Sequence, residues 1–363
     1  MRTAFSILQL ADPHYKEAEK ALRTCVHCGF CTASCPTYSL LGDERDSPRG
    51  RIMLIQNMLE SQEKPTRETV RHLDRCLSCL SCRSACPSGV DYAALIDTAR
   101  VHIGKTYKRP PWQSLFRRFV LSVLMNPGRF GALSRMARLF APLLPGKLGA
   151  MAKKARWKRP QSPQEHFVLV TSPDAPKVLM LQGCVQRALA PSIDRAAERV
   201  LARRDVKTVS VPLCCGALAY HMGEEARAKT EAKQVITAYE LAKADAASMT
   251  ASGCVAFLKD YGRLFAGDPE WADRAEAVAR RAEDFSELAE APADPIKDEK
   301  ARTLLFAYHP PCSLQHGQRI KGRGEELLTQ AGFQVAAIPD THVCCGSAGS
   351  YSLLQPDLSE RLR

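Results

Sequence analysis

The chain has 363 residues, of which 45% are hydrophobic and 25% are charged, as is ordinary for a globular protein. This length allows two or three domains, and no apolar run approaches the length of a membrane span. The 15 cysteines are unusual. Because no export signal is recognisable, we expect a cytoplasmic protein whose cysteines are metal ligands or redox groups rather than structural disulfides.

Two runs of four cysteines are offset by 51 positions, CVHCGFCTASCP at residues 25–36 and CLSCLSCRSACP at residues 76–87. Each has the spacing C-x2-C-x2-C-x3-C-P of two-cluster ferredoxins, in which the fourth cysteine of a run binds the other cluster. Structural zinc is the alternative, but zinc sites usually combine two ligand pairs. The runs therefore predict two [4Fe–4S] clusters, the first held by Cys25, Cys28, Cys31 and Cys86, and the second by Cys35, Cys76, Cys79 and Cys82.

Helix-like segments follow the two runs, RGRIMLIQNMLES and VDYAALIDTARVHI. With the runs they predict an α-helical ferredoxin domain at residues 12–104. His27 lies inside the first run, but its counterpart in the second run is Ser78, so we do not expect His27 to be a ligand.

A basic segment is expected at residues 105–175, with helical periodicity in SLFRRFVLSVLM and RFGALSRMARLFAPLL. Residues 98–164 contain 15 lysines and arginines and no acidic residue, whereas the whole chain has a net charge of +12. Basic helices with apolar side chains suit an anionic membrane surface or an acidic partner. The alternative is a solvated linker that packs on the protein's own domains. Nucleic acid is not an expected partner, because no nucleic-acid motif accompanies the charge.

Residues 176–290 and 300–363 are predicted to form two copies of one Cys-Cys-Gly domain. Each copy has a short apolar strand ending in a cysteine, a helix, and a second strand followed by Cys-Cys-Gly. This is a βαβ pattern, so the expected fold class is multidomain α and α/β, with the cysteines at the carboxyl ends of parallel strands. Only the first copy continues to TASGC at residues 250–254. We therefore expect the second copy to be truncated and the native chain to continue to a Gly-Cys near position 384.

The cysteines of these copies have two open interpretations. They can form an additional redox or cluster site in each copy, or they can be small buried hydrophobic residues. Four histidines near them, His221, His309, His316 and His342, are each expected to be structural. The cysteines in question are Cys184, Cys214, Cys215 and Cys254 in the first copy, and Cys312, Cys344 and Cys345 in the second.

Taken together, the two ferredoxin runs with SPRGRI between them, followed by LQGC, CCGA, TASGC, HPPCSLQHGQ and HVCCGSAG, resemble the iron–sulfur subunits of bacterial glycolate oxidase. The resemblance implies a helical ferredoxin domain and two Cys-Cys-Gly domains akin to those of heterodisulfide reductases. It departs from the heterodisulfide reductase pattern at Ala251, where a CxxC pair with Cys254 needs another cysteine. It also implies partner subunits that carry FAD and oxidise glycolate to glyoxylate.

Neither G-x-G-x-x-G nor G-x-x-x-x-G-K-[ST] occurs in the chain, so we expect FAD only in the partner subunits. The interpretation is an electron-transfer subunit that is not catalytic alone and is peripheral on the inner face of the cell membrane. Three alternatives stay open: a subunit serving lactate or glycerol 3-phosphate, a thiol/disulfide redox protein, and a zinc-bound nucleic-acid binder.

Overall fold

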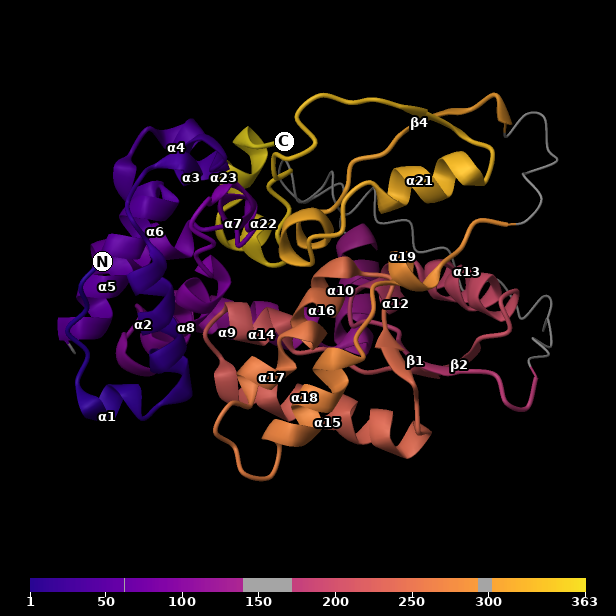
Figure 1. Cartoon of the computed structure of the whole chain (residues 1–363), viewed down its shortest axis with the longest axis horizontal. Helices are drawn as coiled ribbons and strands as arrows, with labels where there is room; N and C mark the ends of the chain where they lie inside the picture. The colour runs from indigo at the N-terminus through magenta and orange to yellow at the C-terminus, as the bar shows by residue number, and fades with distance from the viewer. Residues whose placement is uncertain (62, 140–171, 293–301) are drawn as a thin grey trace.

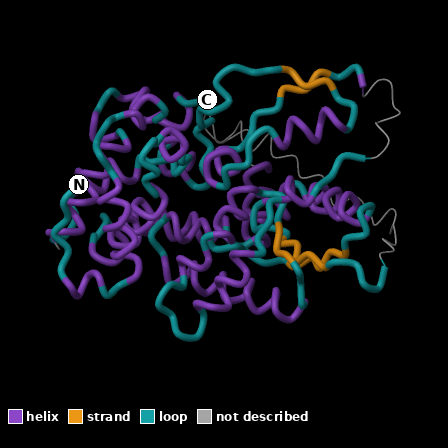
Figure 2. Tube along the Cα trace, in the orientation of Figure 1, coloured by secondary structure: helices purple, strands orange, loops and turns teal. Residues whose placement is uncertain are grey.

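The computed structural model describes residues 1–61, 63–139, 172–292 and 302–363. Its N-terminal part is helical, and two small parallel sheets flanked by helices follow (Figure 1). The strands of the two sheets lie apart, each within its own group of helices (Figure 2). The N-terminal elements are α1 (Ile7–Leu10), α2 (Pro13–Thr24), α3 (Phe30–Ala33), α4 (Pro36–Leu41), η1 (Glu44–Asp46), α5 (Pro48–Ser61), α6 (Arg67–Asp74), α7 (Ser81–Ala85), α8 (Tyr92–Thr106), α9 (Pro111–Leu124) and α10 (Pro127–Leu139).

The N-terminal helices have recognisable start signals and one shared core. The Asp12 side chain accepts a hydrogen bond from the amide of His14 and so caps α2, while Pro13 occupies the first helical position. Buried side chains of α2, α5 and α8, among them Leu22, Ile55 and Leu95, pack into one apolar cluster. The helices predicted at RGRIMLIQNMLES and VDYAALIDTARVHI are thus α5 and α8, and they support the two cysteine runs.

The two runs repeat the same unusual backbone conformation. His27 and Ser78, 51 positions apart, have φ values of 56° and 53°. Gly29 and Leu80, also 51 positions apart, have φ values of 86° and 60°. Left-handed residues in a short loop turn successive backbone N–H groups toward one side, which suits the binding of a negatively charged group. The sequence repeat is therefore also a repeat in structure, and the short helices α3 and α7 that follow these loops contact each other.

The first Cys-Cys-Gly unit contains a three-stranded parallel sheet in the order β2-β1-β3. Alternate residues of β1 face opposite sides. Leu179 and Leu181 join the cluster that includes α15 and α16, while Val178 and Met180 pack against α13. The elements are β1 (Lys177–Leu181), α12 (Gln186–Leu189), α13 (Pro191–Ala202), β2 (Lys207–Val211), α14 (Ala217–His221), α15 (Glu225–Ala242), β3 (Ala246–Ser248), α16 (Ser252–Lys259), α17 (Tyr261–Leu264), α18 (Ala272–Arg280) and α19 (Phe285–Leu288).

The second Cys-Cys-Gly unit is smaller and packs part of its core on the N-terminal helices. Its two strands are parallel, and Leu305 pairs with Gln334. Tyr351 and Leu358 form an apolar cluster with Leu77 of the second cysteine run. The elements are β4 (Leu305–Ala307), η2 (Ser313–Gly317), which is a π-helical turn, α21 (Arg323–Gln330), β5 (Gln334–Ala336), α22 (Tyr351–Leu354) and α23 (Pro356–Arg361).

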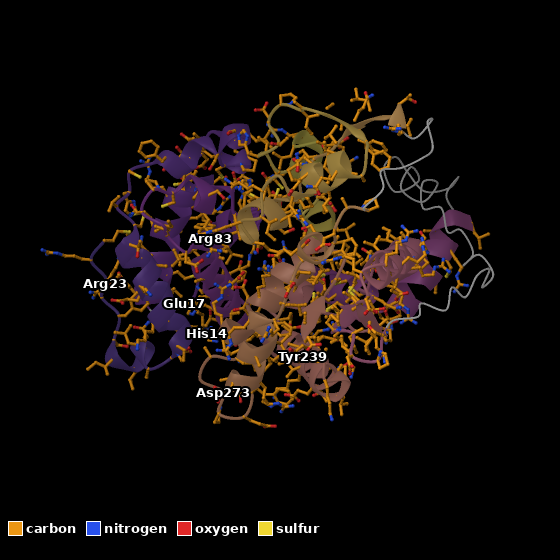
Figure 3. The ribbon with its side chains drawn as sticks, turned by 45° about the vertical axis from the view of Figure 1, so that its right-hand side comes forward. His14, Glu17, Arg23, Arg83, Tyr239 and Asp273 are labelled. Carbon is orange, nitrogen blue, oxygen red and sulfur yellow. The ribbon has the colours of Figure 1, made fainter. Side chains whose placement is uncertain are left out.

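Helix α8 joins the N-terminal helices to the first Cys-Cys-Gly unit. The buried Asp97 on α8 lies 3.3 Å from His221 Nδ1, and its other oxygen lies 3.5 Å from Arg263 Nη2. A Cβ atom at Gly104 would lie 2.3 Å from the carbonyl oxygen of Gly223, so only glycine permits this approach. His14 and Arg83 lie along the same boundary (Figure 3). The two parts are therefore closely packed.

Two helices form most of the described part of the basic segment. Helices α9 and α10 are found at the two predicted stretches, and residues 140–171 lie outside the described residues. Helix α9 buries Val120 and Leu121, and Leu121 joins the core of the first Cys-Cys-Gly unit. Among the described residues, no helix is both long enough and apolar enough to cross a membrane.

Candidate metal centres

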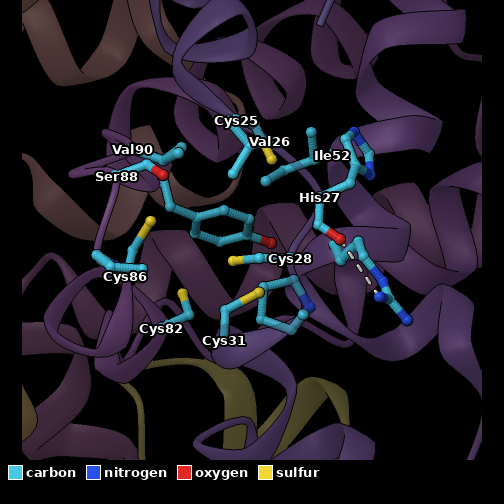
Figure 4. Close-up of a pocket in the computed structure, with 15 residues that line it drawn as sticks. Cys25, Val26, His27, Cys28, Cys31, Ile52, Cys82, Cys86, Ser88 and Val90 are labelled. Carbon is cyan, nitrogen blue, oxygen red and sulfur yellow. Dashed lines mark hydrogen bonds between the residues drawn. The ribbon is translucent and has the colours of Figure 1, made fainter.

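A cavity gathers cysteines from both runs, and we call its four predicted ligands the first cysteine set: Cys25, Cys28, Cys31 and Cys86. Their sulfur atoms face a common space, with Cys82 at its edge (Figure 4). Apolar side chains, including Val26, Ile52 and Val90, form much of the remaining wall. Cys28 is exposed, so this cavity lies near the protein surface.

A second cavity contains the second cysteine set: Cys35, Cys76, Cys79 and Cys82. Cys35 comes from the first run and the other three come from the second run. Cys35 precedes Pro36, and α4 begins at this proline, so the chain enters a helix directly after Cys35. In both cavities the fourth cysteine of one run lies with three cysteines of the other run.

The two cavities share a wall. Pro48, Cys82 and Tyr92 line both of them. Tyr92 is buried, and its hydroxyl donates a hydrogen bond to Cys76 Sγ over 3.7 Å. Groups bound in the two cavities would therefore be neighbours.

The thiols of both sets fit a positively charged iron centre. Burial raises the pKa of Cys31 to about 11, and burial also raises the pKa values of Cys25 and Cys82. Without a cation, these thiols stay protonated at neutral pH. Bound iron holds cysteine as thiolate, and an iron–sulfur cluster uses four such ligands. The donor set in each cavity therefore fits a [4Fe–4S] cluster.

Several groups next to the second set were not singled out in the sequence. Thr37 Oγ1 lies 3.3 Å from Cys35 Sγ, and Arg51 Nη1 lies 3.9 Å from the same sulfur. Arg51 belongs to the SPRGRI stretch, but its burial beside Cys35 depends on packing between α5 and α4. No local signal in the sequence reports such a contact.

The first Cys-Cys-Gly unit brings its four cysteines together at the carboxyl ends of its strands. Hydrogen-bonding contacts link Cys184 to Cys214, Cys214 to Cys215, and Cys215 to Cys254. The hydrogen bond with Cys214, together with burial, raises the pKa of Cys184 above its usual range. Tyr261 Oη donates to the carbonyl oxygen of Cys215 over 2.7 Å, so the Cys-Cys-Gly turn is anchored from α17.

In the second unit, Cys344 is buried and contacts Cys312, whereas Cys345 is exposed. Cys344 also contacts Cys79 of the second cysteine set, across 265 positions of sequence. Cys312 and Cys79 both donate a hydrogen bond to Cys344, and these bonds lower the pKa of Cys344. This contact was not expected from the sequence, and it joins the second unit to the second cavity.

Two of the four histidines have structural partners, as expected. His316 is buried in the π-helical turn η2, with Nδ1 2.8 Å from Ser84 Oγ and Nε2 3.1 Å from the carbonyl oxygen of His342. His221 pairs with Asp97 at the boundary described above. Neither lines either of the two cysteine cavities.

Two family models match the chain. The 4Fe-4S dicluster domain matches residues 21–90, and the cysteine-rich domain matches residues 178–259 and 306–363. Helical packing around two cysteine cavities, followed by these units, defines an iron–sulfur protein with a ferredoxin-type domain and cysteine-rich domains.

Proteins similar in sequence show which family of iron–sulfur proteins the chain belongs to. The glycolate oxidase iron-sulfur subunit of Escherichia coli (strain K12) is 42% identical over 96% of this chain and 84% of its own length. The probable glycolate oxidase iron-sulfur subunit of Bacillus subtilis (strain 168) is 30% identical over 95% of this chain and 83% of its own length. The chain belongs to the family of glycolate oxidase iron–sulfur subunits, so the resemblance noted from the sequence is confirmed.

A lactate utilization protein A from an Exiguobacterium species is 29% identical over 52% of this chain and 78% of its own length. No solved structure matches the chain. The matches support an iron–sulfur electron-transfer role within an oxidoreductase.

Proposed function

We propose that the chain is the electron-transfer subunit of a flavin-dependent glycolate-oxidising complex. Partner subunits carry FAD and oxidise glycolate to glyoxylate, and the electrons pass through this chain to a quinone-type or other acceptor. Bound [4Fe–4S] clusters would supply single-electron transfer, and the flavin of the partner subunits would divide the two-electron oxidation of the substrate into single steps. The ligands are the first and second cysteine sets, each combining three cysteines of one run with the fourth of the other.

The observation that carries this proposal is the common wall of the two cavities. Electron transfer between two centres requires them to be close, and Cys82 and Tyr92 border both cavities. The exposed position of Cys28 favours the first cavity as the one nearer an external partner. The contact of Cys344 with Cys79 favours a continuation from the second cavity toward the second Cys-Cys-Gly unit, whose cysteines we propose as an additional redox site.

A second candidate donor is lactate, because lactate utilization proteins match about half of the chain. A complex of this chain with flavin-containing partner subunits distinguishes the two donors when glycolate and lactate are each supplied with a dye acceptor.

We also propose that the complex contacts an anionic membrane surface through residues 98–164, which overlap the basic segment. Helix α9 exposes an apolar stripe at helical spacing, Trp112, Leu115, Phe116 and Phe119. Arg118 is exposed on the same helix, and no acidic residue occurs between residues 98 and 164. Aromatic side chains together with cations suit the boundary between lipid headgroups and acyl chains.

The purified chain tests the central proposal. We expect it to contain iron and sulfide but no stoichiometric FAD, and to leave glycolate unoxidised in the presence of a dye acceptor. Addition of the flavin subunits is expected to start turnover. FAD in the single chain, or turnover of glycolate by the single chain, contradicts the proposal.

A further inference from the structure

Arg51 is one of the most deeply buried charged residues, with 1% of its surface exposed, and it lies behind the second cysteine set. Its Nε donates to the carbonyl oxygen of His72 over 2.9 Å, and its Nη2 donates to Asp46 Oδ1 over 3.2 Å. Its Nη1 donates to Thr37 Oγ1 over 3.0 Å and lies 3.9 Å from Cys35 Sγ. The guanidinium therefore connects a buried carboxylate to a cysteine of the second cavity.

Arg51 shares a buried carboxylate with a second arginine. Asp46, with 0% of its surface exposed, accepts from Arg51 on one oxygen and from Arg75 on the other, at 2.7 Å. Two guanidinium groups thus share one carboxylate. Asp43, Asp46 and His72 bring three potential metal-ligand atoms within 4.8 Å of one another, but both oxygens of Asp46 already face cations.

Asp43 lies beside Asp46 and pairs with Arg45, and Arg75 is partly exposed, so Arg51 is the cation of this group that is fully buried. A buried charge is unfavourable unless opposite charges lie near it. Cys35, held as thiolate by a bound cluster, is the negatively charged group closest to the free side of Arg51. Arg51 therefore lies between the Asp46 carboxylate and a predicted ligand sulfur of the second cavity.

The first cysteine set has no comparable arrangement in the described part of the chain. Arg49 lines the first cavity, but 37% of its side chain is exposed, and it pairs with Glu44 at 2.8 Å. Its charge is therefore balanced by a carboxylate and screened by water. Among the described residues, the Arg51 and Tyr92 side chains donate to a sulfur of the two runs, and both reach the second set. Thr37 Oγ1 lies 3.3 Å from Cys35 Sγ.

A four-cysteine iron–sulfur cluster has a net negative charge that grows by one when it is reduced, so a buried cavity makes reduction less favourable. Nearby cations and hydrogen bonds to sulfur offset this penalty and raise the reduction potential. We propose that Arg51 sets the reduction potential of the second centre, and this proposal rests on the ligand assignment proposed above. The Arg51 guanidinium, held in place by Asp46 and Thr37, offsets the added negative charge when the buried second centre is reduced. At the more exposed first centre, solvent offsets that charge instead.

The experiment is a redox titration of the iron-loaded full chain, followed by electron paramagnetic resonance of the two reduced centres. In Arg51→Gln we expect the ratio of reduced to oxidised second centre at a given potential to fall at least tenfold, about 59 mV for one electron. Arg51→Lys keeps the charge but loses the planar fork of donors, so its shift is expected in the same direction and smaller. The first centre is expected to keep its midpoint in both variants.

Arg49→Gln is the matched control, because it removes an arginine two positions away and is expected to leave the second centre unchanged. If the Arg51→Gln chain does not bind the second cluster, the midpoints of the second centre in Arg51→Lys and Thr37→Val decide the question, because both substitutions preserve the packing. The inference is overturned if the wild-type chain shows the signals of both reduced centres and the midpoint of the second centre is unchanged in Arg51→Lys, Arg51→Gln and Thr37→Val. A wild-type chain with one centre or none overturns the ligand assignment instead, so the two failures are distinguishable.

Discussion

Cys35 and Cys86 close their own runs but lie in each other's cavities. Cys35 lines the cavity of Cys76, Cys79 and Cys82, and Cys86 lines that of the first run. The left-handed residues at equivalent positions of the two runs give both loops the same course. The crosswise placement therefore follows from the repeat. The assignment of ligands stays a prediction.

Single substitutions at these two residues test the assignment. We expect Cys35→Ser to remove or convert the second cluster while the first keeps its resonance signal, and Cys86→Ser to do the reverse. Serine is a poor ligand for iron in such clusters, yet it nearly preserves the volume of the side chain. Iron content per chain and the two resonance signals are the measurements. Loss of the first signal alone in Cys35→Ser is the result that contradicts the exchange of ligands.

The spacing of the two runs predicted which cysteines lie together in each cavity, because spacing in a short loop is a local property. The strands before Cys184 and Cys312 and the helices after each run were also predicted from periodicity, and the structure contains them. The burial of Arg51 and the contact between Cys79 and Cys344 were not predicted. Both depend on how distant segments pack, and neither leaves a periodic or spaced signal in the chain.

At the scale of single elements, α8 has two functions. Its buried face supports the second cysteine run, because Tyr92 at its start reaches Cys76. Asp97, further along the same helix, pairs with His221 and Arg263 of the first Cys-Cys-Gly unit. Burial alone would raise the pKa of Asp97, but the hydrogen bond with His221 and the charge of Arg263 hold it below its usual value.

We expect Asp97→Asn to lower the free energy of unfolding by about 3 kcal/mol at neutral pH, the scale of breaking a buried ion pair. A carboxylate with a depressed folded pKa stabilises the fold above its unfolded pKa of about 4, and this contribution is lost as the pH falls through the folded value. The difference between variant and wild type should therefore shrink in acid. Urea unfolding at several pH values measures it.

The exposed pair of Arg274 and Glu240 provides the control for Asp97. Glu240→Gln is expected to change the free energy of unfolding by less than about 1 kcal/mol. If Asp97→Asn and Glu240→Gln lower the free energy of unfolding equally, Asp97 stabilises the contact between α8 and the first Cys-Cys-Gly unit no more than an exposed ion pair does.

At the scale of the whole molecule, α9 has one face inside and one face outside. Leu121 packs into the core of the first Cys-Cys-Gly unit, and Arg117 donates to the carbonyl oxygen of Met222. Trp112 and Leu115 are 68% and 71% exposed on the other face. The basic segment is thus neither a free linker nor wholly a surface element. Because α9 is anchored, its exposed stripe is presented in one orientation.

Vesicle binding tests this face. We expect the chain to sediment with phosphatidylglycerol vesicles, to bind phosphatidylcholine vesicles weakly, and to be released by salt. The double variant Phe116→Ser, Phe119→Ser should weaken binding by about tenfold or more, because each phenylalanine loses its apolar burial.

The matched control for the vesicle experiment is Ile7→Ser, Leu8→Ser, which removes two apolar side chains that are 88% and 87% exposed on α1. This control is expected to bind vesicles like the wild type. If the α9 variant keeps its vesicle binding but no longer assembles with the flavin subunits, the stripe contacts protein rather than lipid.

The crosswise cavities also have a topological consequence. A cluster in the first cavity would connect positions 25 and 86, and a cluster in the second would connect positions 35 and 76. Each such crosslink closes a long loop of the unfolded chain, which in the chain-entropy treatment of covalent links is worth about 4 kcal/mol. The loops are nested, so the inner link shortens the loop that the outer link must close. Assembly of one centre would therefore favour assembly of the other, and oxidative loss of either would loosen both.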